Sequence, residues 1–369
     1  MSNLSRSSEK LQLTADLFEK AEKLKEKSLY PQALKLFQKT LIAYREADDP
    51  SGIFHSLTSL GDTYRMTGRF DLAADRYSEA VETAGKINPV LVADAKVGLG
   101  LSLRAQGQWS NALKLIRQSK AFYQKKDDDE GIAFTLWAEA GALRIKGDIP
   151  GTLQTYRESL SVFRSLKDMH GEGYCLCGLG GASRIAGLPK SSLKYYLAAN
   201  RLFAQLKDTF GTAYSYCGIG NAHRMLGDYQ NAFVYFRKAT RLYEKIGDIV
   251  SYSYTLWGLG TAYKMLGEYS AASGYFKKAM ANFKKTKDRR GAIYCMLGQG
   301  EIALMTGRNT SAGKYLDSAL KESAAHRFAI EKCYADTLES FFLRGKADNA
   351  CYDRIGLKLR FHNLPLNIP

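Results

Sequence analysis

Glycine recurs at a nearly constant interval along most of this chain of 369 residues. Each of these glycines ends a pattern typical of an amphipathic helix, and successive ones are separated by 39 residues once and by 40 residues five times. They are Gly68, Gly107, Gly147, Gly187, Gly227, Gly267 and Gly307, and Ser28 stands at the equivalent place before them. A period of about 20–50 residues indicates a solenoid, because each unit has to bury its apolar face against its neighbours.

Each repeat contains two amphipathic stretches on either side of that glycine. In the sixth repeat they read TAYSYCGIGNAHRMLG and YQNAFVYFRKATRLYEKIGD. Glycine at the junction suits the left-handed backbone that ends a helix, while proline suits a first turn and aspartate an N-cap. The prolines and aspartates placed in this way are Pro31, Pro150, Pro189, Asp168, Asp208, Asp248 and Asp288. The repeat is therefore expected to be helix, turn, helix, turn, without strands.

Small and aromatic residues of the repeats resemble the pattern of the tetratricopeptide repeat (TPR) family. The matching residues are Leu60, Gly61, Tyr64, Ala73, Tyr77 and Ala80, then Ile219, Gly220, Ala232, Phe236 and Ala239, then Leu259, Gly260, Tyr263, Ala272, Phe276 and Ala279. The period exceeds the usual ~34 residues of that family, and is similar to polarity-adaptor and activator-sensor arrays with longer repeats. The resemblance implies an all-α fold, a right-handed α-α superhelical solenoid whose concave groove binds ligands.

Four segments are expected along the chain. Residues 1–13 are a flexible N-terminus, and residues 14–322 are eight TPR-like repeats of about 40 residues. Residues 323–360 fit the repeat poorly and are expected to form capping helices, because a solenoid has to cover its last apolar face. Residues 361–369 are expected to be a tail that is flexible or docked on this cap.

Numbering each repeat so that Gly220 is position 8 divides its first helix into two faces. Positions 4, 7, 8 and 11 share a packing face, and positions 2, 5, 9 and 12 form a second stripe more than about 100° away. By resemblance to TPR proteins, this second stripe lines the concave groove. Position 12 carries Lys25, Arg65, Arg104, Arg144, Arg184, Arg224 and Lys264, which we call the cation row.

The cation row is expected to need negative partners, because like charges on helices about 8–10 Å apart lie within roughly one Debye length. The stripe offers few acids, namely Asp62, Asp94 and Glu301, and the whole chain has a net charge of +16. Arginine binds carboxylates in a bidentate manner, and Tyr, Trp and Arg are typical of binding hot spots. We therefore predict that the groove binds an extended acidic peptide or protein segment. The candidate residues are Arg65, Arg104, Arg144, Arg184, Arg224, Lys264, Phe134, Tyr174, Tyr214, Tyr254, Trp137, Trp257 and Asn221.

Several alternatives stay open for these residues. The cations would be structural if they bridge to carboxylates or helix carbonyls, and the tyrosines would then be packing residues. A nucleic acid would use the cations on its phosphates and the aromatics for stacking. A regulatory sensor would close on a small anionic or peptide signal, as the activator-type resemblance suggests.

Catalytic and metal chemistry find no support in the sequence. It lacks the P-loop, G-x-S-x-G and H-E-x-x-H patterns, and its five histidines show no ligand spacing. Glycine pairs such as Gly218 and Gly220 recur with the period and follow no strand, which indicates close helix packing rather than a nucleotide loop. We expect no enzyme activity, no metal and no cofactor.

The location of the protein is expected to be cytoplasmic. The first twenty residues contain no apolar signal region, and no uninterrupted apolar stretch reaches the ~18 residues that a membrane span needs. The six cysteines lie inside helical patterns and are expected to be free, mostly buried thiols.

Overall fold

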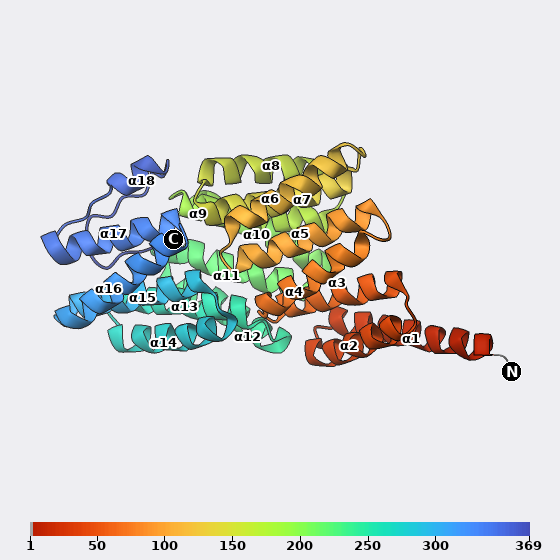
Figure 1. Cartoon of the computed structure of the whole chain (residues 1–369). Helices are drawn as coiled ribbons and strands as arrows, with labels where there is room; N and C mark the ends of the chain where they lie inside the picture. The colour runs from red at the N-terminus through yellow and green to blue at the C-terminus, as the bar shows by residue number, and fades with distance from the viewer. Residues whose placement is uncertain (1–2) are drawn as a thin grey trace.

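The computed structural model describes residues 3–369, and every regular element within them is a helix (Figure 1). The helices are α1 (Asn3–Glu26), α2 (Tyr30–Glu46), α3 (Pro50–Met66), α4 (Phe70–Ala84), α5 (Pro89–Ala105), α6 (Trp109–Gln124), α7 (Asp129–Lys146), α8 (Ile149–Ser165), α9 (Met169–Ile185), α10 (Pro189–Leu206), α11 (Thr209–Met225), α12 (Tyr229–Ile246), α13 (Ile249–Met265), α14 (Tyr269–Thr286), α15 (Arg289–Met305), α16 (Asn309–Ala325), α17 (Ala329–Arg344) and α18 (Ala350–Arg354). The prediction of an all-α, right-handed superhelical solenoid is confirmed.

The first sixteen helices form eight successive pairs joined by short turns. One correction concerns the start of the chain. Residues 1–13 were expected to be flexible, but α1 already begins at Asn3, and only residues 1–2 lie outside the described part. The apolar pattern of the first repeat therefore continues a helix that starts well before Thr14.

The turns have the conformations that their residues predict. Gly147 and Gly227 have φ angles of 95° and 80°, a left-handed conformation in which an L side chain is strained. At the start of the next repeat, the Asp208 side chain accepts a hydrogen bond of 2.8 Å from the backbone N–H of Gly211. Local chemistry thus ends one helix and begins the next.

The paired glycines leave room for aromatic rings. A Cβ at Gly218 would lie 2.2 Å from the Tyr196 ring, and one at Gly180 would lie 2.8 Å from the same ring. Phe236 is held in the same way between Gly220 and Gly258. The rings of Tyr77, Tyr196, Phe236 and Phe276 on α4, α10, α12 and α14 therefore each fit between two glycine backbones, one in their own repeat and one in the next. Close packing, rather than a nucleotide loop, explains these glycines.

The superhelix closes on itself in space. Turn residues of the early repeats contact the late ones: Gly107 lies against the Phe328 ring and Gly187 against Leu359. Across the same seam, Lys287 Nζ lies 2.6 Å from a carboxylate oxygen of Asp71. Figure 1 accordingly shows the blue C-terminal helices beside the yellow and green middle repeats. This closure brings early and late repeats together across the concave face.

The last helices contain a disulfide that the sequence analysis did not expect. α17 packs against α15 and α16, and Cys333 on this helix is bonded to Cys351 on α18, with a Cα–Cα distance of 5.5 Å. The expectation that all six thiols are free is therefore wrong for these two cysteines, which the turn after α17 brings together.

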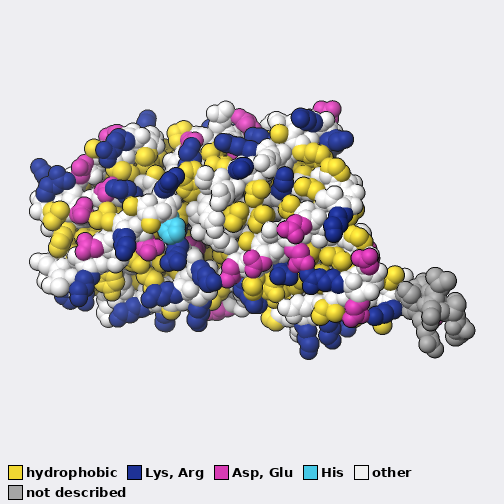
Figure 2. Space-filling view, viewed as in Figure 1, with side chains coloured by type: hydrophobic (Ala, Val, Ile, Leu, Met, Phe, Trp, Pro, Cys, Tyr) yellow, Lys and Arg dark blue, Asp and Glu magenta, His cyan; other side chains and the backbone are white. Residues whose placement is uncertain are grey.

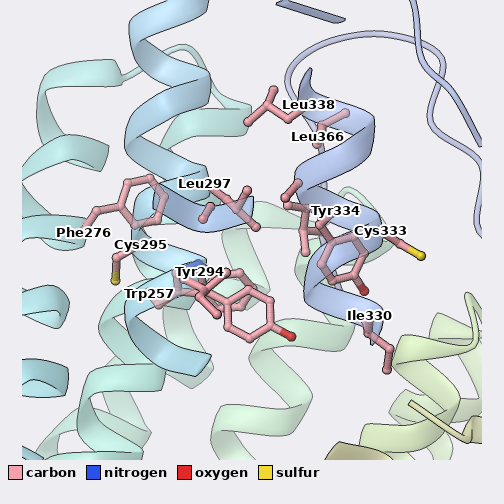
Figure 3. Close-up of a cluster of buried hydrophobic side chains, with 14 of the residues drawn as sticks. Trp257, Phe276, Tyr294, Cys295, Leu297, Ile330, Cys333, Tyr334, Leu338 and Leu366 are labelled. Carbon is pink, nitrogen blue, oxygen red and sulfur yellow. The ribbon is translucent and has the colours of Figure 1, made fainter. Parts of the chain in front are cut away.

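The C-terminal core unites helices with irregular chain. Tyr334 and Leu338 of α17 face Leu297 of α15, and Leu366 lies beside Leu338 (Figure 3). The tail is thus neither flexible nor docked on the cap alone, as the sequence analysis expected, but runs past the cap into the interior.

The glycine contacts predict a contrast between two substitutions. Gly98→Ala is expected to destabilise the protein by about 1–3 kcal/mol, because its Cβ would lie 2.1 Å from the buried Tyr77 ring. Gly274→Ala in α14 is the matched control. It has open space around its Cβ position and is expected to stabilise by up to about 1 kcal/mol. Urea unfolding followed by circular dichroism measures both, and equal midpoints for the two variants would contradict the packing argument.

Candidate functional site

The first helices of the repeats build the concave face, and two adjacent cavities lie on it. One has a volume of about 510 Å³ and the other about 250 Å³. Eleven of the thirteen predicted site residues line one or both of them, namely Arg65, Arg104, Arg144, Arg184, Phe134, Trp137, Tyr174, Tyr214, Asn221, Tyr254 and Trp257. The other two, Arg224 and Lys264, are covered by the end of the chain.

The larger cavity has an aromatic wall. Phe134, with 43% of its surface exposed, stacks on Trp137 with a centroid distance of 5.7 Å. Trp137 in turn meets Tyr174 edge-on at 6.5 Å. Phe210, which lies outside the predicted stripe, is in the first turn of α11 and also lines this cavity. Such a surface favours a large apolar side chain of a ligand.

Three of the arginines that line the smaller cavity have no carboxylate partner within residues 3–369. Among the described residues, no carboxylate oxygen lies within 4.0 Å of Arg104, Arg144 or Arg184. Nε of Arg144 and Nε and Nη1 of Arg184 are buried and make no hydrogen bond within the described part of the chain. Burial lowers the pKa of Arg104 to about 10, and the positive charges of Arg144 and Arg65 act in the same direction. This cavity is therefore a place where an anion would be stabilised.

Small residues at position 9 make room for these arginines. The Arg104 guanidinium lies against the backbone of Gly141, and the Arg144 guanidinium lies near Gly181. Arg104 is also 5.5 Å from the centroid of Trp137, a cation–π distance. Each arginine thus reaches from its own repeat across to the next one.

The N-terminal end of the cation row is paired within its own helices. Lys25 Nζ lies 2.5 Å from a carboxylate oxygen of Glu22, and Arg65 lies 3.4 Å from one of Asp62. These two cations therefore fit the alternative in which the cation row is structural, because each pairs with a carboxylate of its own helix. The row is therefore not uniform, and its middle three arginines differ from its ends.

The C-terminal end of the row binds residues 364–369, which we call the terminal segment. Arg224 donates a hydrogen bond of 2.8 Å to the carbonyl oxygen of Ile368 and another to the side-chain oxygen of Asn367. Asn367 Nδ2 donates back to the Arg224 carbonyl oxygen at 3.1 Å. Asn221, a predicted site residue, accepts from Arg224 Nη2 at 3.2 Å. The chain itself is thus bound where the sequence analysis predicted a ligand.

A buried ion pair holds the same segment one repeat further on. Lys264 Nζ pairs with Glu301 and donates a hydrogen bond of 2.8 Å to the carbonyl oxygen of Leu366, while Glu301 accepts from the Leu366 N–H. Side-chain exposure is 2% for Lys264 and 0% for Glu301. Burial lowers the pKa of Lys264 and raises that of Glu301. Because burial disfavours both charged forms, the pair depends on its mutual contact and on the backbone groups of Leu366.

The tyrosines of position 2 have packing partners as well as cavity surface. The Tyr174 hydroxyl donates to Asp208 at 3.0 Å, and its ring packs on Phe203 at 4.9 Å. Tyr254 packs on Phe283 at 4.8 Å. The periodic pattern also did not indicate Arg290. This residue lies in the first turn of α15, lines the smaller cavity and pairs with Glu331 at 2.6 Å.

The face of the molecule seen in Figure 2 carries basic side chains that are not gathered into one patch. Figure 2 shows lysines and arginines scattered over the visible face among acidic side chains. In the described chain, no helix is long and apolar enough to cross a membrane. Nor do three or more His, Cys, Asp or Glu residues gather there in a way that suits a metal ion.

Family models match two parts of the chain. A model described as tetratricopeptide repeat matches residues 13–86 and 173–245, and a second model with the same description matches residues 58–127. Together they cover residues 13–127 and 173–245, just over half of the sequence. No curated protein matches the chain.

Solved structures share the fold at low sequence identity. A Rap protein complexed with competence and sporulation factor has a TM-score of 0.65 at 16% identity, covering 93% of this chain and 98% of that one. The Rap conjugation gene regulator of plasmid pLS20, in complex with the Phr* peptide, has a TM-score of 0.65 at 13% identity and coverages of 87% and 94%. NprR in complex with its cognate peptide NprX has a TM-score of 0.60 at 14% identity and coverages of 87% and 95%.

The unpaired arginines predict a specific response to anions. Inorganic phosphate, added at constant ionic strength, is expected to raise the thermal midpoint of the wild-type protein, because an anion that binds only the folded state stabilises it. Arg144→Gln/Arg184→Gln is expected to lose most of this shift. The matched control is Lys277→Gln/Lys284→Gln, which removes two exposed charges from α14. Equal phosphate shifts in all three proteins, measured by differential scanning fluorimetry, would contradict an anion site in the smaller cavity.

Proposed function

Because this chain belongs to the tetratricopeptide repeat family, we propose that it is a non-enzymatic peptide-binding adaptor or sensor. Its ligand is an extended acidic peptide or protein segment that also carries a large apolar side chain. The carboxylates bind Arg104, Arg144 and Arg184, and the apolar side chain enters the aromatic cavity beside Trp137. The peptide is recognised by complementary charge and apolar contact, and no covalent bond is formed or broken.

The observation that carries this proposal is the way the groove holds the terminal segment. Arg224, Lys264 and Glu301 bind main-chain groups of residues 366–368, so the concave face already has the chemistry that recognises a peptide backbone. Immediately beside these contacts lie the arginines without carboxylate partners. An acidic side chain is the peptide component that satisfies a guanidinium group best.

The fold neighbours support the same mode of binding. The pLS20 Rap regulator and NprR structures are complexes with peptides. Their identity to this chain is below 25%, so they support a solenoid able to enclose a peptide, and the acidic preference rests on the arginines alone. Several buried arginine–carboxylate contacts together are consistent with affinities from about micromolar to nanomolar.

A sensor is favoured over a passive adaptor by the closure of the superhelix. Residues of early and late repeats, among them Phe70 and Tyr294, line the same smaller cavity, and the ion pair of Asp71 and Lys287 joins these repeats. A ligand bound there touches both halves and therefore changes the stability of the closed form. The close approach of the two halves also disfavours a long nucleic acid, whose phosphates need an open basic surface.

An array of synthetic nine-residue peptides tests the proposal. The peptides vary in their number of Asp and Glu residues and carry one Trp or none. Binding to wild-type protein is expected to rise with acid content and to be stronger with Trp. Arg104→Glu/Arg144→Glu/Arg184→Glu is expected to weaken binding by at least about tenfold, equivalent to 1.4 kcal/mol or more.

The control for this experiment reverses three exposed lysines of α14, Lys277→Glu/Lys284→Glu/Lys285→Glu, with the same change in net charge. It is expected to bind the peptides as the wild type does once salt screens the outer surface. If both triple variants lose binding equally, the arginine cavity is not the site. If a single-stranded RNA oligonucleotide binds more tightly than any peptide, with a steep salt dependence, the function is nucleic-acid binding instead.

A further inference from the structure

We infer that the terminal segment is an intramolecular ligand, which occupies a peptide-binding site on α11, α13 and α15 and competes there with external peptides. The class of ligand for this site is an extended peptide with aliphatic side chains at two alternate positions and an amide between them. The inference rests on the proposed function only in that the competing ligand is a peptide. The site itself, formed by Arg224, Lys264 and Glu301, is distinct from the arginine cavity.

The groove contacts main-chain groups of Leu366 and Ile368 and the side chain of Asn367 between them. Leu366 uses both its N–H and its carbonyl oxygen, and Ile368 uses its carbonyl oxygen. Between them, Asn367 exchanges hydrogen bonds in both directions with Arg224. Contacts to main-chain groups are available to any peptide, so the site does not require covalent continuity with the rest of the chain.

Two aliphatic side chains anchor the segment. Leu366 is 0% exposed and Ile368 is 3% exposed, although neither belongs to a helix or strand. Leu366 lies beside Leu338 of α17 (Figure 3). Burial of these two side chains stabilises the bound segment, and the loss of conformational freedom on ordering it offsets part of this gain.

The buried charged side chains beneath the terminal segment are more typical of a ligand-binding site than of a permanent hydrophobic core. Lys264, Glu301 and Arg224 are all buried, and each makes a hydrogen bond that ends on the terminal segment. For a permanent core, apolar residues of similar volume would do as well or better, because desolvation of charges is costly. When the segment leaves, these groups face an empty groove, and a replacement peptide restores their partners.

Pro369 links the terminal segment to the arginine cavity. Pro369 lines the 250 Å³ cavity together with Arg144 and Arg184. A peptide that spans both sites therefore overlaps residues 366–369 and has to displace them. Since a tethered ligand has an effective concentration on the order of millimolar, the segment raises the apparent Kd of every competitor. Ligand binding is thereby coupled to release of the chain's own terminal segment.

The test uses a fluorescent synthetic peptide with the sequence of residues 361–369, titrated into full-length proteins. Wild-type protein is expected to bind it weakly, because the site is filled. Leu366→Asp/Ile368→Asp, which disrupts the resident segment, is expected to bind it at least about tenfold more tightly. Asn367→Ala removes only the side-chain contacts with Arg224, and is expected to shift the affinity in the same direction by less. This milder variant keeps the test valid if the double variant disturbs the cap.

Two controls make the result specific. The peptide carrying the same two Asp substitutions is expected not to bind any protein. Leu188→Asp/Leu266→Asp, which places the same charges on exposed turns, is expected to behave as the wild type. Circular dichroism checks that all variants keep their helical content.

A second titration distinguishes this inference from the proposed function. It uses the acidic peptide that binds most tightly in the array, added to the same proteins. If release of the segment tightens both peptides, the segment is a competing ligand. If the acidic peptide binds all folded variants equally and the 361–369 peptide binds none, the segment is a fixed strap and the inference is overturned, while the proposed function stands. If the 361–369 peptide binds the released variants and no acidic peptide binds, the inference stands and the acidic preference is wrong.

Discussion

The fit of an aromatic ring between two glycine backbones sets the geometry on which this structure depends. Tyr196 lies between Gly180 and Gly218, and Phe236 has an equivalent pair in the next repeats. A glycine inside a helix costs about 1 kcal/mol relative to alanine, whereas burial of a large side chain contributes about 1.5–3 kcal/mol. The ring therefore fixes how closely successive repeats approach. Repeated along the chain, this spacing winds the solenoid until its late repeats meet its early ones.

Closure gives the cation row three different environments. At one end Lys25 and Arg65 pair with acids of their own helices. In the middle Arg104, Arg144 and Arg184 face a cavity, with glycine or other small groups beneath them. The same residue type at the same repeat position thus ranges from a structural ion pair to an arginine without a carboxylate partner on a cavity wall. What differs is whether the neighbouring positions supply a carboxylate.

At the other end of the row, the chain supplies its own partner. Arg224 and Lys264 are buried because residues 366–368 cover them, and the Lys264–Glu301 pair is completed by the main chain of Leu366. Buried charges of this kind are stable only while every partner is in place. The groove is consequently most sensitive to whatever occupies it, and the proposed role as a peptide sensor rests on this sensitivity.

The sequence by itself determined the repeat, the helix–turn–helix unit, the helix ends and the stripe that faces the groove. These follow from local chemistry: Gly147 ends a helix, Asp208 begins one, and periodicity places position 12 on a single face. Eleven of the thirteen candidate residues line the cavities for that reason. Only the tertiary structure decided that the superhelix closes, that Cys333 meets Cys351, and that the terminal segment fills the groove over Arg224. Those contacts join residues far apart in the chain, and no local period or cap encodes them.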